Sequence, residues 1–238
     1  VTMSDFDRSR WTEEEFSQEY RDHADEYVPD RRRMIAITQS LYRHFVKRGR
    51  EDREVRVLDL GCGDGLFIHE LRQVDAKLDA TLVDGSGEML EAAGRRLADL
   101  DHKRLVRASF QDLLAEDCLK TPFDFILSSL AIHHLPLSEK VALFEYIYAH
   151  LNPGGMFLNV DVVLSPGEDL ERWYLALWHD WIVAHSDVSR YPELLNVPQR
   201  YKANPDNVPD TLRVQLEAIE RIGFRQVDCY YKFGIYVM

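Results

Sequence analysis

Short apolar runs alternate with segments of helical period between residues 55 and 164. Five runs rich in β-branched and aliphatic residues are typical of buried strands, namely VRVLDL, LDATLVD, LVRAS, FDFILSSL and GMFLNVDVVL. Several of the segments between them carry apolar residues three or four positions apart, as in a helix that buries one face. Strands that alternate with helices of ~10–15 residues imply right-handed crossovers and a mostly parallel sheet covered on both faces. The pattern therefore predicts a doubly wound α/β fold.

The N-terminal residues and the stretch after the fifth strand follow other patterns. Residues 4–47 have the apolar spacing of helices, and Thr12 is a suitable N-cap for the first of them. Residues 168–190 are helical and rich in aromatic side chains. The following residues, 191–209, hold four prolines and are expected to form an irregular cover.

The C-terminal residues are expected to complete the sheet. A helical pattern begins at Asp210 and ends at Gly223, a residue typical of a helix C-cap. The last residues, RQVDCYYKFGIYVM, indicate two short strands around a tight turn, and strands joined in this way pair antiparallel. We expect a Rossmann-like, mostly parallel seven-stranded sheet with an antiparallel C-terminal hairpin strand. The single expected domain divides into a helical cap (1–50), a core (51–165), a cover inserted after the fifth strand (166–209) and a C-terminal helix with strands (210–238).

Composition limits the partners of this chain. Acidic residues outnumber basic ones 41 to 29, which gives a formal charge of −12, and such a surface repels phosphate backbones and anionic lipid. No window approaches the ~18 consecutive apolar residues that span a bilayer. Three isolated cysteines, Cys62, Cys118 and Cys229, fit a reducing compartment. We expect a cytoplasmic protein with no nucleic acid, membrane or metal as a partner.

A glycine cluster directly follows the first strand of the core. The residues DLGCGDG place Gly61, Gly63 and Gly65 where the strand turns into a helix, and glycine permits positive φ and the close approach of a ligand. Asp84 ends the next strand, and an acid ~20 residues after such glycines is placed to bind the two hydroxyls of a ribose. A tight connection alone would explain the glycines, but the acid favours a nucleoside site.

The glycine spacing argues against a nicotinamide dinucleotide. That fingerprint runs G-x-G-x-x-G and holds a pyrophosphate at a helix N-terminus. The spacing here is G-x-G-x-G, with Asp59 before the loop and Asp64 inside it. Two carboxylates repel a pyrophosphate and suit a ligand that carries positive charge.

With these motifs the chain resembles the class I S-adenosylmethionine-dependent methyltransferases. The resemblance rests on VLDLGCGDG, Asp84 and the later LNPGG, and it runs from about Val55 to Leu164. It implies S-adenosylmethionine as cofactor and S-adenosylhomocysteine as product. In that family the glycine loop passes beneath the methionine moiety, an acid equivalent to Asp84 binds the ribose, and Asp59 would support the loop and the ammonium end. The residues expected to bind the cofactor are Arg31, Asp59, Gly61, Cys62, Gly63, Gly65, Asp84, Gly85, Met89, Ser109, Phe110, Gln111, Ser129 and Leu130.

The adenine end departs from the family pattern. The family has an acid near the end of the third strand, whereas here that place falls at Ser109, followed by Gln111 and Asp112. Asp112 is either a helix cap or the substitute for the missing acid.

Within the class, the layout is similar to that of the carboxy-S-adenosylmethionine synthases, which modify the cofactor for transfer to a tRNA uridine. A gap-free alignment of the C-terminal segment places Arg200 on the arginine that binds the extra carboxylate in the synthases. The glycine loop differs from theirs, and Arg31 falls where they carry a tyrosine. We expect a methyltransferase that acts on a small-molecule acceptor. A synthase and a non-catalytic module that binds S-adenosylmethionine are the alternatives.

Two histidines follow the fourth strand, at the edge where open α/β sheets bind ligands. His133 is a candidate base, since a histidine there can remove a proton near neutral pH. For at least one of the pair a structural role is favoured, as a cap of the next helix or packed beneath the helical cap. The candidate acceptor contacts are His134, Trp181, Arg200 and Tyr201, although the spacing of the aromatic residues in residues 168–190 favours a packed seam over a substrate cage. A homodimer is one assembly that this sequence allows.

Overall fold

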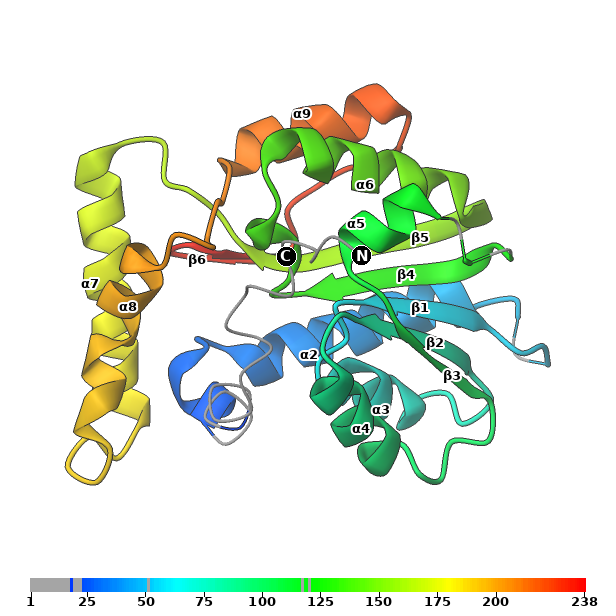
Figure 1. Cartoon of the computed structure of the whole chain (residues 1–238), viewed down its shortest axis with the longest axis horizontal. Coiled ribbons are helices and arrows are strands. Elements are labelled where there is room, and N and C mark those ends of the chain that lie inside the picture. The colour runs from blue at the N-terminus through cyan, green and yellow to red at the C-terminus, as the bar shows by residue number, and fades with distance from the viewer. Residues whose placement is uncertain (1–17, 19–22, 51, 117, 120) are drawn as a thin grey trace.

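The computed structural model describes residues 18, 23–50, 52–116, 118–119 and 121–238. A seven-stranded sheet in the order β3-β2-β1-β4-β5-β7-β6 runs through its centre (Figure 1). The strands β1 to β5 pair in parallel, whereas β7 pairs antiparallel with β5 and with β6. The predicted fold class is therefore confirmed. The strands are β1 (Arg56–Leu60), β2 (Asp79–Asp84), β3 (Lys103–Arg107), β4 (Phe123–Ser129), β5 (Leu151–Val162), β6 (Lys232–Phe233) and β7 (Tyr236–Val237).

Strand β1 lies where the strand order reverses. Its side chains are buried on both faces because helices cover both, and this explains why the strand reads as a continuous apolar run. Leu60, at the end of β1, is in register with Val83 of β2 and with Ser128 of β4. The carboxyl ends of three strands thus meet at one edge, which is the crevice where open α/β sheets bind ligands.

Helices cover both faces of the sheet (Figure 1). The helices α2, α3 and α4 lie on one side, and α5, α6 and α9 lie on the other. Each side has its own cluster of buried apolar side chains packed on the sheet. The elements are α2 (Arg31–Leu41), the π-helix η3 (Tyr42–Lys47), α3 (Leu66–Arg72), α4 (Gly87–Arg96), α5 (Phe110–Ala115), the 3-10 turn η4 (Ile132–His134), α6 (Leu137–Ala149) and α9 (Leu212–Ile222).

The insertion after β5 stands beside the sheet, next to β6 (Figure 1). It contains α7 (Glu168–His185), η5 (Pro192–Asn196) and α8 (Val197–Ala203). The expectation of an irregular stretch over 191–209 was therefore partly wrong. Pro192 and Pro198 stand in the first turns of η5 and α8, where a missing N–H costs no hydrogen bond.

The aromatic side chains of α7 form a packed seam. Trp178 is buried, its ring lies 5.6 Å from that of Tyr201, and its Nε1 donates to the carbonyl of Tyr27 at 2.6 Å. The cover is in this way joined to the N-terminal segment. The predicted helix start at Thr12 lies outside the described residues. Within the described part of the chain, no helix combines the length and the apolar character needed to cross a membrane.

Candidate active site

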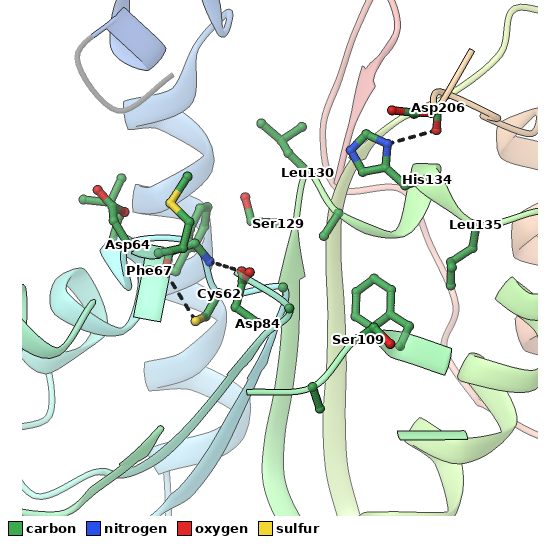
Figure 2. Close-up of a pocket in the computed structure, with 18 of the residues that line it drawn as sticks. Cys62, Asp64, Phe67, Asp84, Ser109, Ser129, Leu130, His134, Leu135 and Asp206 are labelled. Carbon is green, nitrogen blue, oxygen red and sulfur yellow. Dashed lines mark hydrogen bonds between the residues drawn. The ribbon is translucent and has the colours of Figure 1, made fainter. Parts of the chain in front are cut away.

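A cavity of about 230 Å³ opens at the carboxyl ends of β1, β2 and β4. Its walls come from the glycine loop after β1, the turn after β2, the start of α5, the segment after β4 and the start of α2. Figure 2 shows Cys62 and Asp84 on one side of this cavity and His134 with Asp206 on the other.

The glycine loop needs its glycines for two different reasons. Gly61, Gly63 and Gly65 all have positive φ, at 68°, 53° and 75°, a region that other residues adopt at a cost. A Cβ on Gly61 would lie only 2.4 Å from the Cβ of Ala131, so this glycine permits a close approach of two backbone segments. A Cβ on Gly63 would meet no atom within 4 Å. Gly63 therefore faces open space, and a ligand can lie against its backbone.

Asp84 is held in place by this loop. Its Oδ2 accepts a hydrogen bond from the N–H of Gly63 at 2.8 Å, and its Oδ1 accepts one from the N–H of Ser86 at 2.8 Å. Burial raises the pKa of Asp84, and the two N–H groups act in the opposite direction. A carboxylate oriented in this way at the cavity wall still has lone pairs to accept from a pair of hydroxyls.

Asp59 lies behind the loop and not on the cavity wall. It is 2% exposed, and its Oδ1 has no hydrogen-bond partner among the described residues. Burial, followed by the negative charges of Asp84 and Asp64, raises the pKa of Asp59 well above its usual value. Asp64 in turn pairs with the guanidinium of Arg96. The glycine loop is thus surrounded by carboxylates, an environment that favours a cation.

The start of α5 answers the question about Asp112. Ser109 and Asp112 form a capping box: the Ser109 Oγ accepts from the Asp112 N–H at 3.1 Å, and the Asp112 Oδ2 accepts from the Ser109 N–H at 2.9 Å. Asp112 is therefore a helix cap and does not line the cavity. Phe110 and Gln111 do line it, and the Gln111 amide donates to Glu139 at 2.7 Å.

Arg31 brings a positive charge to the cavity from the start of α2. Its side chain is 14% exposed, and its Nη1 lies 2.7 Å from Asp25 Oδ1. This pairing, with that of Arg32 to the same carboxylate, lowers the pKa of Asp25 against the effect of burial.

The segment after β4 turns sharply into the cavity. Leu130 has a φ of 52°, which costs a leucine ~1–2 kcal/mol, and its N–H donates to the carbonyl of Val160 at 2.7 Å. Such strain is retained where the surrounding structure imposes it, often at functional sites. The turn leads into η4, which carries the two histidines.

The two histidines have different surroundings. His133 is 6% exposed and does not reach the cavity; its Nδ1 lies 2.6 Å from Asp161 Oδ1. His134 lines the cavity, and its Nδ1 lies 3.0 Å from the carbonyl oxygen of Asp206. The ring centroids of the two are 4.0 Å apart. His134, rather than His133, therefore lies on the cavity wall.

Most of the residues predicted for the cofactor lie on the cavity wall. Those on it are Arg31, Gly61, Cys62, Gly63, Asp84, Gly85, Met89, Ser109, Phe110, Gln111, Ser129 and Leu130, together with His134 from the acceptor set. Those away from it are Asp59, Gly65, His133, Trp181, Arg200 and Tyr201.

The predicted residues that do not line the cavity have other surroundings. A Cβ on Gly65 would lie 3.1 Å from Ala93, so this glycine lets α3 pack closely on α4. Trp181 stacks on His185 with ring centroids 3.6 Å apart. Arg200 is exposed on α8, and the neighbouring Tyr201 packs on Trp178. The gap-free alignment thus does not bring Arg200 to the cavity.

Several lining residues were not predicted, among them Leu66, Phe67, Leu135 and Asp206, whereas Ala131 lines the cavity as the resemblance implies. The first three are apolar, and their spacing is typical of residues in a hydrophobic core. Asp206 lies in a loop remote in sequence from the glycine motif, and nothing local marked it. Within the described residues, no group of three or more His, Cys, Asp or Glu side chains is placed to hold a metal ion.

Comparisons with known proteins agree with this geometry. A family model described as a methyltransferase domain matches residues 58–157. A carboxy-S-adenosyl-L-methionine synthase of Trichlorobacter lovleyi is 25% identical over 179 residues, which cover 73% of this chain and 70% of the relative. A synthase of the same name from Staphylococcus epidermidis is 22% identical over 232 residues, which cover 96% of this chain and 95% of the relative.

Solved structures with a similar fold are also found. The plantazolicin methyltransferase BpumL, solved in complex with SAH, has a TM-score of 0.60 and 16% sequence identity, with 94% of this chain and 76% of that chain covered. At such identity the likeness concerns the fold alone. Residues 58–157 thus match a methyltransferase domain, and the glycine loop with its acid and the seven-stranded sheet agree with the similarity of this chain to S-adenosylmethionine-dependent enzymes of the class I methyltransferase type.

Proposed function

We propose that this enzyme transfers a methyl group from S-adenosylmethionine to a small-molecule acceptor and releases S-adenosylhomocysteine. The observation that carries the proposal is Asp84, whose two oxygens are fixed by the N–H groups of Gly63 and Ser86 beside a glycine that faces open space. A ribose edge fits this carboxylate, because its two vicinal hydroxyls are both donors.

We assign roles to the other residues from their places on the cavity wall. Gly61, Cys62 and Gly63 pass beneath the methionine moiety, and the guanidinium of Arg31 is suited to its carboxylate. Phe110, after β3, offers an apolar face to the adenine. Asp59 acts from behind the loop through its charge, since it does not line the cavity.

The charge of the cavity favours a sulfonium. Its wall holds the carboxylates Asp64, Asp84 and Asp206, and Arg31 is the one arginine or lysine among the lining residues of the described chain. S-adenosylmethionine, when bound, supplies a methyl group on a positively charged sulfur, and transfer from it needs mainly proximity and in-line alignment. The chain's own part is to bind, orient and shield.

The acceptor is proposed to lie between the segment after β4 and the two helical additions. The N-terminal cap, with α2, and the insertion, with α7 and α8, contact each other through Trp178 and Tyr27. We also propose that the N-terminal cap and the insertion form one domain with the core. The reducing cytoplasm is the proposed location, supported by three cysteines without disulfides.

Calorimetry and product analysis test the proposal together. S-adenosylmethionine and S-adenosylhomocysteine should both bind, and incubation with hydroxyl, amine and thiol compounds should yield a methylated acceptor, detected by mass spectrometry. Failure of both nucleosides to bind the folded protein would exclude the proposed function.

A carboxy-S-adenosylmethionine synthase is the second candidate, because the similar relatives carry that name. An extra carboxylate next to the sulfonium needs a cationic partner. Arg200, the residue aligned with such a partner, is exposed on α8 and does not line the cavity. The mass of the nucleoside that copurifies with the protein separates the candidates, since the synthase product is heavier by a carboxyl group.

A further inference from the structure

Asp206 brings a carboxylate to the cavity wall from the loop between α8 and α9. This loop ends the cover that follows β5, and Figure 2 shows Asp206 beside His134, across the cavity from Cys62 and Asp84. The ribose is proposed to bind at Asp84, on the other wall. Asp206 therefore lies on the side of the cavity that is left for the acceptor.

The backbone of this loop is held on both sides of Asp206. The Asp206 carbonyl oxygen lies 3.0 Å from Nδ1 of His134, and the Asp206 N–H donates to Asn204 Oδ1 at 3.1 Å. Two residues further on, the Val208 N–H donates to the His133 carbonyl at 3.0 Å. A carboxylate on a backbone fixed in this way is oriented before a ligand arrives, which lowers the cost of binding.

The three carboxylates of the cavity wall differ in their surroundings. Asp64 pairs with the guanidinium of Arg96, and Asp84 accepts from two backbone N–H groups. Both hydrogen bonds of Asp206 use backbone atoms, and within the part of the chain that the structure describes no side chain pairs with its carboxylate. Asp206 is thus the lining carboxylate that remains available to a ligand.

The basic groups next to the loop do not offset the charge of Asp206. Lys140, whose ammonium holds the loop through a backbone carbonyl, is paired with Asp210 at 2.6 Å. Burial, followed by the charge of His133, lowers the pKa of His134 to about 3, so this ring is neutral at neutral pH. The negative charge of Asp206 is therefore left for solvent or a ligand to balance.

Apolar side chains lie on the same side of the cavity as Asp206. Leu130 and Leu135 line the cavity, and Figure 2 shows both on this side. Opposite charges attract more strongly beside apolar groups than in water, because the effective dielectric constant is lower there. A molecule with an apolar body and a positively charged end fits such a wall.

We propose, resting on the methyl transfer proposed above, that Asp206 binds a cationic nitrogen group of the acceptor and so selects acceptors that carry one. An ammonium, amidinium or guanidinium group donates hydrogen bonds to a carboxylate and balances its charge. This group is distinct from the methylated atom, because attack on the methyl carbon needs a lone pair that a protonated nitrogen lacks. The acceptor thus combines an apolar body, a cationic nitrogen group and a separate neutral nucleophile.

Matched small molecules test the charge preference on protein saturated with S-adenosylhomocysteine. One set of probes is benzamidine, benzamide and benzoate, and the other is phenethylamine, 2-phenylethanol and 3-phenylpropionate. The members of a set are similar in size and differ in charge. In NMR titrations that observe the probe, the cation of at least one set should bind roughly tenfold or more tightly than its partners. Equal binding within both sets, tighter binding of a neutral or anionic member, or no binding by either cation overturns the inference.

Variants locate the preference at Asp206. D206N keeps the shape of the side chain and should lose the advantage of the cation, and D206K should favour the anionic probes instead. S-adenosylhomocysteine affinity should stay unchanged in D206N, which shows that the rest of the site is intact. The control D180N removes the charge of a side chain that is 80% exposed on α7 and should bind the probes as the parent does. A preference for the cation that survives in both Asp206 variants overturns the inference.

Kinetics separate this inference from the proposed function. For an acceptor found by product analysis, D206N should raise KM roughly tenfold or more with kcat nearly unchanged, because the contact is made equally in the ground state and the transition state. A methylated acceptor without a cationic group overturns the inference. Weaker S-adenosylmethionine binding in D206N, with probe binding unchanged, also overturns it, because the carboxylate then acts on the sulfonium. Absence of nucleoside binding to the parent protein would instead defeat the proposed function itself.

Discussion

Asp84 carries the nucleoside assignment at the scale of single residues. In Asp84→Ala the ribose hydroxyls lose a charged partner, and the N–H groups of Gly63 and Ser86 lose theirs. We expect S-adenosylhomocysteine to bind about 1.5–3 kcal/mol more weakly, the range for hydrogen bonds to a charged group. Calorimetry measures this. The control Asp79→Ala, at the other end of β2, should bind as the parent does, and unchanged affinity in the Asp84 variant would remove Asp84 from the site.

Substitutions at Gly61 and Gly63 are expected to have different effects, the first on folding stability and the second on ligand binding. Gly61→Ala places a methyl group 2.4 Å from Ala131 at positive φ, so we expect a loss of about 2–4 kcal/mol in the free energy of unfolding. Gly63→Val meets no atom and should cost only the ~1–2 kcal/mol of the left-handed backbone.

Nucleoside binding should nevertheless be lost in Gly63→Val, because the new side chain fills the space that Gly63 faces. Urea unfolding and calorimetry on the same samples measure both quantities. A Gly63 variant with native affinity would show that the ligand takes another path.

Residue chemistry was predictable where a local motif specifies it. The glycines and Asp84 follow from strand ends and spacing, both of which are local. The choice between His133 and His134 was not predictable, because adjacent residues on a 3-10 turn point in different directions and only the strained turn at Leu130 decides which one reaches the cavity. Asp206 was missed since its contact spans 72 residues of sequence.

At the scale of elements, a buried lysine joins α6 to the segment before α9. Lys140 is 0% exposed, and its Nζ donates to the Val208 carbonyl and to Asp210 Oδ2, both at 2.6 Å. Lys140→Met should lower the free energy of unfolding by about 2–4 kcal/mol. This loss is smaller than that of a fully buried ion pair, because Asp210 keeps contact with water.

The exposed pair of Lys202 and Glu171, at 3.0 Å, provides the matched control. Lys202→Met should cost under about 1 kcal/mol. Urea unfolding measures both variants, and equal losses would mean that burial of Lys140 adds nothing. The segment fixed by Lys140 also includes the residues that hold His133 and His134, so its loosening should broaden the His134 nitrogen resonances.

Elements were predictable to the extent that periodicity marks them. The strands β1, β2 and β4 were found because each is largely buried and reads as a continuous apolar run. The edge strand β3 is mostly exposed, and it was found from its β-branched and aliphatic residues alone. The helices α5 and α8 were missed, since both are short, and a helix of six or seven residues shows fewer than two full turns of pattern. Proline also served as a misleading breaker signal, because its place in the first turn of α8 is compatible with a helix.

At the scale of the whole molecule, the buried carboxylates link folding to pH and to the charge of the ligand. Burial, followed by the charges of Asp84 and Asp64, holds the pKa of Asp59 well above 3.8 in the folded protein. Between 3.8 and that raised pKa the folded protein binds more protons than the unfolded chain, so the free energy of unfolding falls as pH rises through this window. A cation in the cavity offsets the cost of burying the carboxylate charge of Asp59. The buried charge therefore favours binding of the ligand, although it lowers the free energy of unfolding.

Asp59→Asn keeps the shape of the side chain and removes its charge. We expect a higher free energy of unfolding above that window and a shallower fall with rising pH, because the folded protein no longer has to bury a carboxylate charge. At pH values above that window, where Asp59 is ionised, S-adenosylmethionine should bind roughly tenfold more weakly to the variant, the Coulomb energy of about 1–2 kcal/mol for charges several Å apart at an effective dielectric constant of about 20. S-adenosylhomocysteine, neutral at sulfur, should lose less. Urea unfolding at several pH values and calorimetry with both nucleosides measure these effects. Equal losses for the two nucleosides would mean that the charge of Asp59 does not act on the sulfonium.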